Sequence, residues 1–406
     1  MGFTDLSPSV REATEPQNTK NDKMKFDIIK VRRQLHGMPE LGFEEHQTSR
    51  LIAQILRSFG LEVHENIAQT GVIGVLRGQD ETLPVLGYRA DMDALPVCEM
   101  LDVPWRSTNG CMHACGHDAH MAIALGVAHI LASERPRRGI AFVFQPNEEG
   151  APGELPSGAE LMCQEGLLER FHISQMLALH CDPTLPSGKM GVCHGALWAA
   201  SGRFKCKVLG KPSHAAYPHR GCDALRAAAE MCAIYHPMYQ VGQLPDTAQA
   251  HEVFSICKLQ AGTAFNVIAG EAEFEGIIRA CSHQRILEMA QKFEKDIQKV
   301  ASVYGVSFQF ECFLGAESVV NDEALTNKAW KVWDDMKMAQ HMTMTMAAED
   351  FSHFSIKIPS FYAMLGVKPK EIQEIPPLHS DCFTIDEQAL EVGVQAMTVL
   401  IRTLCV

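Results

Sequence analysis

The segment IAFVFQPNEEG, residues 140–150, joins an apolar run to a turn that carries two adjacent glutamates. Residues 140–144 are all apolar, and the run stops at the turn, which predicts a short strand buried on both faces. A helix fits residues 119–133 before it, and a second apolar strand fits residues 176–180 after it. Strands that alternate with helices in this way indicate an α/β layered core.

The same alternation of predicted helices and strands extends toward the N-terminus. It predicts helices at residues 26–35 and 44–59 and strands at residues 71–76 and 84–88. The two helices are separated by HGMPELGFEE, residues 36–45, in which Pro39 and Gly42 break the helical pattern. Residues 1–24 are polar and contain no apolar segment, so we expect a disordered leader there.

The pattern changes at Gly202. From there it predicts strand, helix, strand, strand, helix and strand at residues 203–209, 223–239, 253–259, 272–280, 284–304 and 306–312. This β-α-β-β-α-β order is the ferredoxin-like pattern, which forms a self-contained unit. After this unit the α/β pattern continues, with a helix predicted at residues 322–336, a strand at 360–365 and a helix at 387–404.

The smaller unit is therefore inserted into the larger one. We expect an α/β fold in which residues 25–201 and 313–406 form one domain and residues 202–312 form an inserted lid. The two separated pieces of the larger domain must come together in space.

Composition and charge exclude several classes of protein. The 406 residues include 36 Lys and Arg against 49 Asp and Glu, a formal net charge of −13, which disfavours nucleic acid and anionic membranes as partners. No apolar run is long enough to cross a membrane. The 14 cysteines contain no C-x-x-C pair and no secretory signal precedes them, so we expect reduced thiols in a cytoplasmic protein.

Signatures of common enzyme classes are absent from the chain. It contains no P-loop, no G-x-G-x-x-G, no G-x-S-x-G and no H-E-x-x-H. The residues that remain for chemistry are of the metal-binding type, and they follow predicted strands.

The densest group is HACGHDAH, residues 113–120, directly before a helix. Cys115 and His117 are two residues apart around Gly116, so in an extended loop their side chains point the same way. Thiolate and imidazole are good ligands for zinc. A helix start that is merely rich in histidine is the alternative.

The glutamates of QPNEEG follow a strand end, and open α/β sheets bind ligands beyond the carboxyl ends of their strands. Glu149 is suited to binding a metal, while Glu148 is suited to taking a proton from water. The alternative is a solvated turn.

Three more candidates also follow strands or prolines. His180 lies in ALHCDP, His379 in PPLHSDCF and Asp91 in RADMDALP. Each histidine fits either a metal ligand or a structural residue, and Asp91 fits either a turn or a carboxylate that orients a ligand. In the lid, His214 and His219 of KPSHAAYPH and Asn266 of FNVIAG suit a substrate carboxylate or oxyanion, or are ordinary polar loop residues.

Taken together, these motifs resemble the metal-dependent amidohydrolases of the aminoacylase/carboxypeptidase superfamily. The chain is most similar to the branch with hippurate hydrolases and plant hydrolases of indole-acetyl amino acids. HGMPELGFEE, RADMDALP, HACGHDAH, QPNEEG, KPSHAAYPH, NVI and LHSDCF occur in that branch's order between residues 36 and 383. The resemblance implies a zinc-exopeptidase-like catalytic domain with a ferredoxin-like lid, around two divalent metal ions of zinc, manganese, cobalt or nickel.

The resemblance also implies a role for each residue. The metal ligands would be Cys115, His117, Glu149, His180 and His379. Glu148 would be the general base, Asp91 the supporting carboxylate, and His214 and Asn266 the lid residues that bind substrate. The lid would also form a homodimer.

The implied reaction hydrolyses the amide bond of an N-acyl amino acid, such as an N-acetyl or benzoyl derivative. Its products are a carboxylic acid and a free amino acid. Two alternatives stay open: a dipeptidase or carboxypeptidase that uses the same residues, and a protein that binds metal or ligand without catalysis. The sequence departs from the branch at Asn147, Cys181 and the pair Asp381 and Cys382, but none of these replaces an implied ligand.

Overall fold

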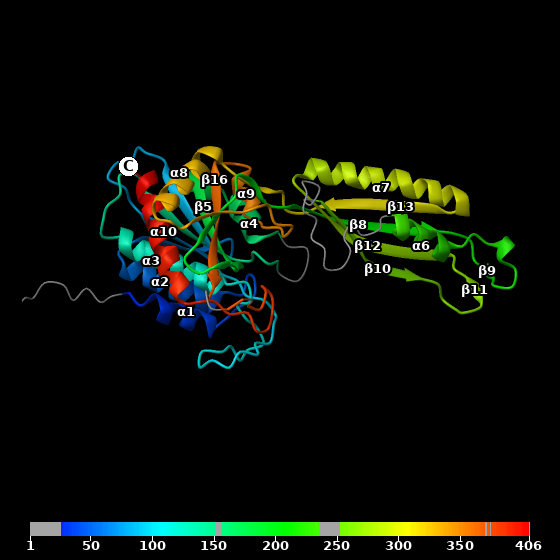
Figure 1. The fold of residues 1–406 in the computed structure, drawn as a ribbon, viewed down its shortest axis with the longest axis horizontal. Coiled ribbons are helices and arrows are strands. Elements are labelled where there is room, and N and C mark those ends of the chain that lie inside the picture. The colour runs from blue at the N-terminus through cyan, green and yellow to red at the C-terminus, as the bar shows by residue number, and fades with distance from the viewer. Residues whose placement is uncertain (1–25, 151–155, 235–251, 370–371, 374, 406) are drawn as a thin grey trace, which may run out of the picture.

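The computed structural model describes residues 26–150, 156–234, 252–369, 372–373 and 375–405. The chain forms an elongated molecule in which a slender lid extends from a larger α/β unit (Figure 1). The predicted leader, residues 1–24, lies outside the described residues. Within the described ranges, no helix is both long and apolar enough to span a membrane.

The α/β unit is built on one eight-stranded mixed sheet in the order β1-β2-β4-β3-β5-β16-β6-β15. Its strands are β1 (Glu62–Ile67), β2 (Gly71–Leu76), β3 (Val85–Asp91), β4 (Ile140–Gln145), β5 (Ile173–Pro186), β6 (Met190–Val192), β15 (Ala339–His341) and β16 (Ser360–Lys368). The central strands β4, β3, β5 and β16 are parallel to one another. β4 is buried along its whole length, which confirms the strand predicted at residues 140–144.

Helices cover both faces of this sheet, as a parallel centre requires. One face packs against α1 (Ile28–His36), α2 (His46–Ser58), α3 (His117–Leu131), α8 (Glu323–Asp335) and α10 (Gln388–Leu404). The other face packs against the short helices α4 (Gly158–Gln164), α5 (Leu167–Arg170) and α9 (Ser352–Ser355). Nearly every residue of α3 is buried, so this helix is a fixed support for whatever its N-terminus carries.

The lid has the predicted ferredoxin-like topology. Its elements are β8 (Ala200–Leu209), α6 (Ala224–Ile234), β10 (Val253–Ala261), β12 (Glu271–Ala280), α7 (His283–Tyr304) and β13 (Ser307–Leu314). The sheet order is β10-β12-β8-β13 and all neighbours are antiparallel. Phe204 of β8 and Phe293 of α7 meet in its core with ring centroids 5.8 Å apart. Residues 235–239 of the predicted first helix lie outside the described part of the chain.

The two connections between lid and α/β unit run side by side. Ser201 N donates to Ala316 O and Gly315 N donates to Ser201 O, both at 2.8 Å. Next to them β7 (Gly195–Trp198) pairs with β14 (Val319–Asn321). The far end of the lid holds β9 (Ser213–His214), η1 (Pro218–Arg220) and β11 (Val267–Ile268) (Figure 1). The proposed domain limits at residues 202 and 312 stay a prediction.

Candidate metal centre

The carboxyl edge of the central sheet brings three chain segments together. β3 ends at Asp91, which is paired with Gln145 at the end of β4, and the QPNEEG turn follows directly. Helix α3 begins at His117, after Gly116 in the left-handed region at φ +90°. That conformation favours glycine, and it turns the chain between Cys115 and His117.

All five predicted ligands lie together at this edge. Cys115 Sγ lies 3.4 Å from His180 Nε2 and 3.4 Å from His379 Nε2. Glu149 Oε1 lies 3.2 Å from His379 Nε2 and 3.9 Å from His117 Nε2. Within 4.8 Å, the donor atoms form two groups: Cys115, His117 and His180, and Cys115, Glu149 and His379. Two donor groups that share one thiol suit a pair of neighbouring cations.

The hydrogen bonds of two histidines leave the correct nitrogen available for a cation. His117 Nδ1 lies 2.9 Å from the Asp93 carbonyl oxygen, and His180 Nδ1 lies 2.7 Å from the Cys181 carbonyl oxygen. Because a carbonyl only accepts, each Nδ1 carries a proton, which leaves Nε2 as the nitrogen that can bind a metal. His117 Nε2 is buried and has no hydrogen-bond partner among the described residues. A metal ion would satisfy it.

Two aspartates contact the histidines of this edge. Asp91 accepts from Arg89 Nη1 at 2.5 Å and lies 2.6 Å from His120 Nδ1, and its Oδ2 lies 3.8 Å from His117 Nε2, so its role as the supporting carboxylate stays a prediction. Asp93 also contacts the ligand side: its Oδ1 lies 3.2 Å from His117 Nδ1, and its Oδ2 accepts from Glu149 N at 2.9 Å. The sequence analysis did not single out Asp93, which lies two residues after Asp91, beyond the end of β3.

Glu148 is held differently from Glu149. Its carboxylate has no hydrogen-bond partner in the described chain, and it lies 4.0 Å from His117 Nε2. One of its oxygens lies within 4.8 Å of carboxylate oxygens of Glu349 and Asp350. Burial, together with the charges of Glu349 and Glu149, raises the pKa of Glu148 well above its usual range. A raised pKa makes a carboxylate a stronger base than an ordinary glutamate, which suits a group that accepts a proton.

Negative charge exceeds positive charge at this edge. The buried guanidinium of Arg89 contacts Glu349 at 2.9 Å and Asp350 at 3.1 Å. Burial opposes a charge on His117, but Asp91, Asp93 and Glu149 outweigh it and raise the pKa of His117 to about 10. Divalent cations would neutralise this excess.

The thiol of Cys115 also indicates that a cation binds at this site. Burial and the charges of Glu149 and Glu148 raise the pKa of Cys115 well above its usual range. The thiolate that binds a metal therefore forms when a cation offsets those charges. A set of one thiol, three imidazoles and a carboxylate fits zinc, manganese, cobalt or nickel.

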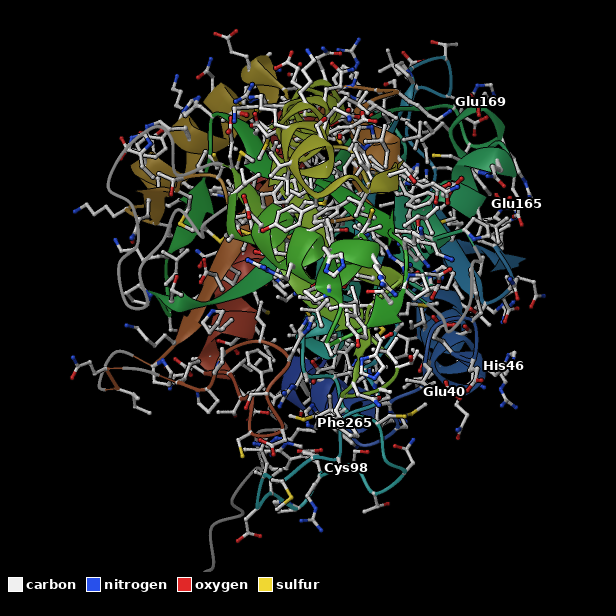
Figure 2. The ribbon with its side chains drawn as sticks, turned by 90° about the vertical axis from the view of Figure 1, so that its right-hand side faces the viewer. Glu40, His46, Cys98, Glu165, Glu169 and Phe265 are labelled. Carbon is white, nitrogen blue, oxygen red and sulfur yellow. The ribbon has the colours of Figure 1, made fainter. Side chains whose placement is uncertain are left out.

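The two predicted lid residues do not reach this cluster. His214 and Asn266 lie beside each other, since His214 pairs with Val267 and Ala215 N donates to Asn266 O at 2.9 Å. They lie at the far end of the lid (Figure 1). The neighbouring Phe265 is fully exposed there, as the view along the molecule shows (Figure 2). Their role in substrate binding stays a prediction.

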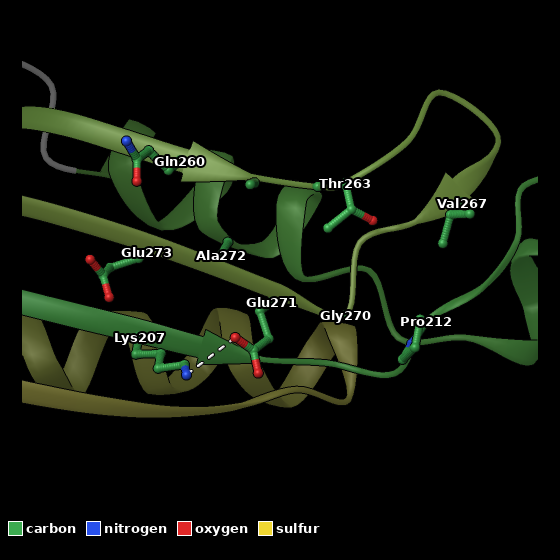
Figure 3. A pocket seen from close by; sticks show the side chains of 11 residues that line it. Lys207, Pro212, Gln260, Thr263, Val267, Gly270, Glu271, Ala272 and Glu273 are labelled. Atoms are coloured by element: carbon green, nitrogen blue, oxygen red, sulfur yellow. Dashed lines mark ion pairs between the residues drawn. The ribbon is translucent and has the colours of Figure 1, made fainter.

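Two of the hollows in the described chain bear on the search for a substrate site. One of about 500 Å³ lies beside Glu148 and is lined by polar residues that include Glu160, Glu349 and Asp350, and by Gly315 at the lid connection. The other, of about 470 Å³, lies on the lid sheet (Figure 3). Each of its charged residues is already in an ion pair, Lys207 with Glu271 at 3.2 Å and Glu273 with Lys205 at 3.1 Å. The first is the hollow next to candidate chemistry.

The donor cluster lies beside Glu148, whose carboxylate has no hydrogen bond from the described residues. Together with an α/β unit and an inserted ferredoxin-like lid, this site defines a class of metal-dependent hydrolases. Residues 87–403 match Peptidase family M20/M25/M40, and the chain belongs to this family.

Known relatives extend over almost the whole chain. An N-acetylcysteine deacetylase of Bacillus subtilis is 33% identical over 373 residues, covering 91% of this chain and 94% of its own. A thermostable carboxypeptidase of Saccharolobus solfataricus is 32% identical over 391 residues, covering 95% and 97%. A solved structure from Bacillus subtilis, described as a dinuclear metal-binding peptidase of the M20 family, is 31% identical, has a TM-score of 0.80 and covers 93% and 97%. The predicted fold class is confirmed.

Proposed function

We propose that this protein hydrolyses the amide bond of N-acyl amino acids to a carboxylic acid and a free amino acid. The observation that carries the proposal is the placement of Glu148, with no hydrogen bond to its carboxylate from the described residues, against a cluster of five metal-type donors. The deacetylase relative, whose name describes removal of an acetyl group from an amino acid, supports this choice.

Cys115, His117, Glu149, His180 and His379 would hold two divalent ions. When bound, such ions polarise the amide carbonyl and lower the pKa of water. The soft thiolate favours zinc, although availability decides among zinc, manganese, cobalt and nickel.

Glu148 performs the proton transfers. Its carboxylate accepts the proton from the attacking water, and the raised pKa lets it keep that proton while the carbonyl carbon is attacked. It then delivers the proton to the departing amide nitrogen, so that the amino acid leaves as a neutral amine. Asp93 keeps His117 in the tautomer that presents Nε2 to the cluster.

The lid residues would reach the donors most directly in a second copy of the chain. His214 and Asn266 lie too far along the lid to meet the donors of their own chain in this arrangement. β10 is an edge strand of the lid sheet, so a second lid has a free edge to pair with. A homodimer through the lid would place His214 of one chain over the other chain's site, where it stabilises the oxyanion.

A carboxypeptidase or dipeptidase is the second candidate. The named carboxypeptidase relative favours it, and so does the acidic hollow beside Glu148, which suits a free amine on the acyl side. We place the reaction in the cytoplasm, because all fourteen cysteines are free thiols, as in a reducing compartment.

A substrate panel tests the proposal. The protein, stripped with chelator and reloaded with zinc, manganese, cobalt or nickel, is assayed on N-acetyl amino acids, hippurate and dipeptides. We expect release of free amino acid from the N-acyl compounds, loss of activity with chelator and its return with metal. Activity on dipeptides alone would favour the second candidate, and metal binding without any hydrolysis would contradict an enzyme.

A further inference from the structure

The turn that carries Glu148 has an unusual backbone. Asn147, the residue before Glu148, is fully buried and has φ +48°, in the left-handed region that residues other than glycine seldom adopt. Because the Glu148 side chain has no hydrogen bond in the described chain, the position of its carboxylate depends on its backbone and on the packing around it. The conformation of this turn therefore affects the position of the proposed base.

Two buried carboxylates hold the backbone on either side of Glu148. Asn147 N donates to Glu45 Oε1 at 2.9 Å, and Glu149 N donates to Asp93 Oδ2 at 2.9 Å. Hydrogen bonds from an amide to a carboxylate are about twice as strong as neutral ones. Glu45 is completely buried, and its other oxygen accepts from Thr70 Oγ1 at 2.5 Å.

The HGMPELGFEE segment packs against this turn, and its packing places the Glu45 carboxylate beside Asn147 N. A Cβ on Gly42 would lie 2.1 Å from Asn147 Oδ1, so glycine allows the segment to pack against Asn147. Glu40 Oε2 accepts from Gln47 N at 2.9 Å and from Thr48 N at 3.0 Å, which ties the segment to the start of α2. Glu40 and His46 lie at this exposed end of the helix (Figure 2).

We propose that Glu45 is a positioning residue, which fixes the Asn147 backbone and thereby aims the carboxylate of Glu148 at the metal cluster. The inference rests on the proposed hydrolase function for its kinetic consequences. It assigns a role to a segment that contributes no side chain to the metal centre. The competing explanation is that Glu45 only stabilises the core.

The test compares Glu45→Ala with Glu45→Gln and with Glu44→Ala, a matched control at the exposed neighbouring glutamate. In Glu45→Ala we expect kcat to fall about 100-fold, the usual effect of misplacing a catalytic group by about 1 Å, with KM and metal content unchanged. Glu45→Gln keeps a carbonyl oxygen for Asn147 N, so it should recover most of kcat. Glu44→Ala should behave as wild type.

Hydrogen exchange of the peptide spanning residues 140–150 supplies a readout that does not depend on activity. We expect faster exchange of the 147 and 149 amides in Glu45→Ala and wild-type protection in Glu44→Ala. If Glu45→Ala does not fold, Thr70→Val removes the hydroxyl that anchors Glu45 and should lower kcat and amide protection in the same direction.

Two results would overturn the inference. One is a Glu45→Ala protein that melts at lower temperature but keeps wild-type kcat per folded molecule; the other is unchanged protection of the two amides. A wild-type protein that cleaves no N-acyl amino acid would refute the proposed function instead, and hydrogen exchange would still decide whether Glu45 holds the turn.

Discussion

Glu148 and Glu149 are consecutive residues with different surroundings. Glu149 lies 3.2 Å from His379 Nε2 and shares a donor group with Cys115, whereas Glu148 faces the carboxylates of Glu349 and Asp350. The two glutamates lie in the bend after β4 and their carboxylates meet different groups, so one glutamate can bind metal while the other faces water. The two roles are separable by mutation.

We expect Glu148→Gln to keep both metal ions and to lose turnover by about 10²–10⁴-fold, the usual contribution of a positioned acid or base. Substrate binding should survive, because the lost interaction acts in the transition state. Glu149→Gln should lose metal, and high metal concentration should restore part of its activity. Metal analysis and kinetics on both variants check this. Metal loss in Glu148→Gln with retention in Glu149→Gln would reverse the assignment.

For single residues, the sequence predicted which side chains belong to the site better than it predicted what those side chains contact. The set of five donors was expected from the resemblance to the amidohydrolase motifs, and their roles as ligands stay a prediction. From the residues alone, Cys115 and His117 pointed to a metal, whereas His180 and His379 fitted a structural role as well. Asp93 and Glu45 could not be predicted, because their roles depend on backbone amides of another segment, and no side-chain pattern records which amide a carboxylate reaches. Asp91 satisfied the same pattern as Asp93, but it faces Arg89 and His120.

At the scale of elements, the start of α3 controls the metal centre. Gly116 separates Cys115 from His117 at φ +90°, and a Cβ there would lie 3.2 Å from Cys181 Cβ and 3.3 Å from its sulfur. A side chain at this position would therefore meet both backbone strain and a tight contact. Either would shift the two ligands that flank it.

We expect Gly116→Ala to lower metal content and thermal stability together. Its matched control is Gly110→Ala, since Gly110 has φ +84° with nothing within 4 Å of an added Cβ. Both variants carry the left-handed strain of about 1–2 kcal/mol, but only Gly116→Ala should lose metal. Metal analysis and calorimetry on the two proteins check this. Equal metal content in both would show that α3 tolerates the change and that Gly116 does not set the ligand geometry.

Elements with strong periodicity could be predicted closely. β2 has the predicted bounds Gly71–Leu76, and α7 begins one residue before the predicted helix. Short elements such as β6, β15 and α9 were not predicted, because three or four residues carry too little periodicity and their pairing partners are distant in sequence. α3 starts at His117, two residues earlier than predicted, because the glycine turn rather than a side-chain cap begins it.

At the scale of the whole molecule, the lid separates two sets of residues that the proposed reaction needs together. Sequence order showed that the lid is inserted, but not how far its tip lies from the sheet edge. That distance depends on the length and direction of the lid strands, and Figure 1 shows them pointing away from the α/β unit. His214 thus needs either a large lid movement or another chain.

Mixing two inactive variants distinguishes these possibilities. Glu148→Gln lacks the base but has an intact lid, and His214→Ala lacks the lid histidine but has an intact base. If each lid serves the partner's site, a heterodimer of the two contains one complete site and should recover about half of wild-type activity. If each lid closes on its own chain, every site in the heterodimer is defective.

The heterodimer is obtained by co-expression with two different affinity tags and sequential purification, and amino acid release is measured against both parent homodimers. Lys211→Ala, a change at an exposed residue near His214 in the lid, is the matched control and should be active alone. We expect recovery, because His214 lies at the tip of the lid, away from the α/β unit that holds the donors, while β10 is an edge strand of the lid sheet in the described chain. A heterodimer as inactive as its parents would refute a shared site and assign His214 to movement of its own lid.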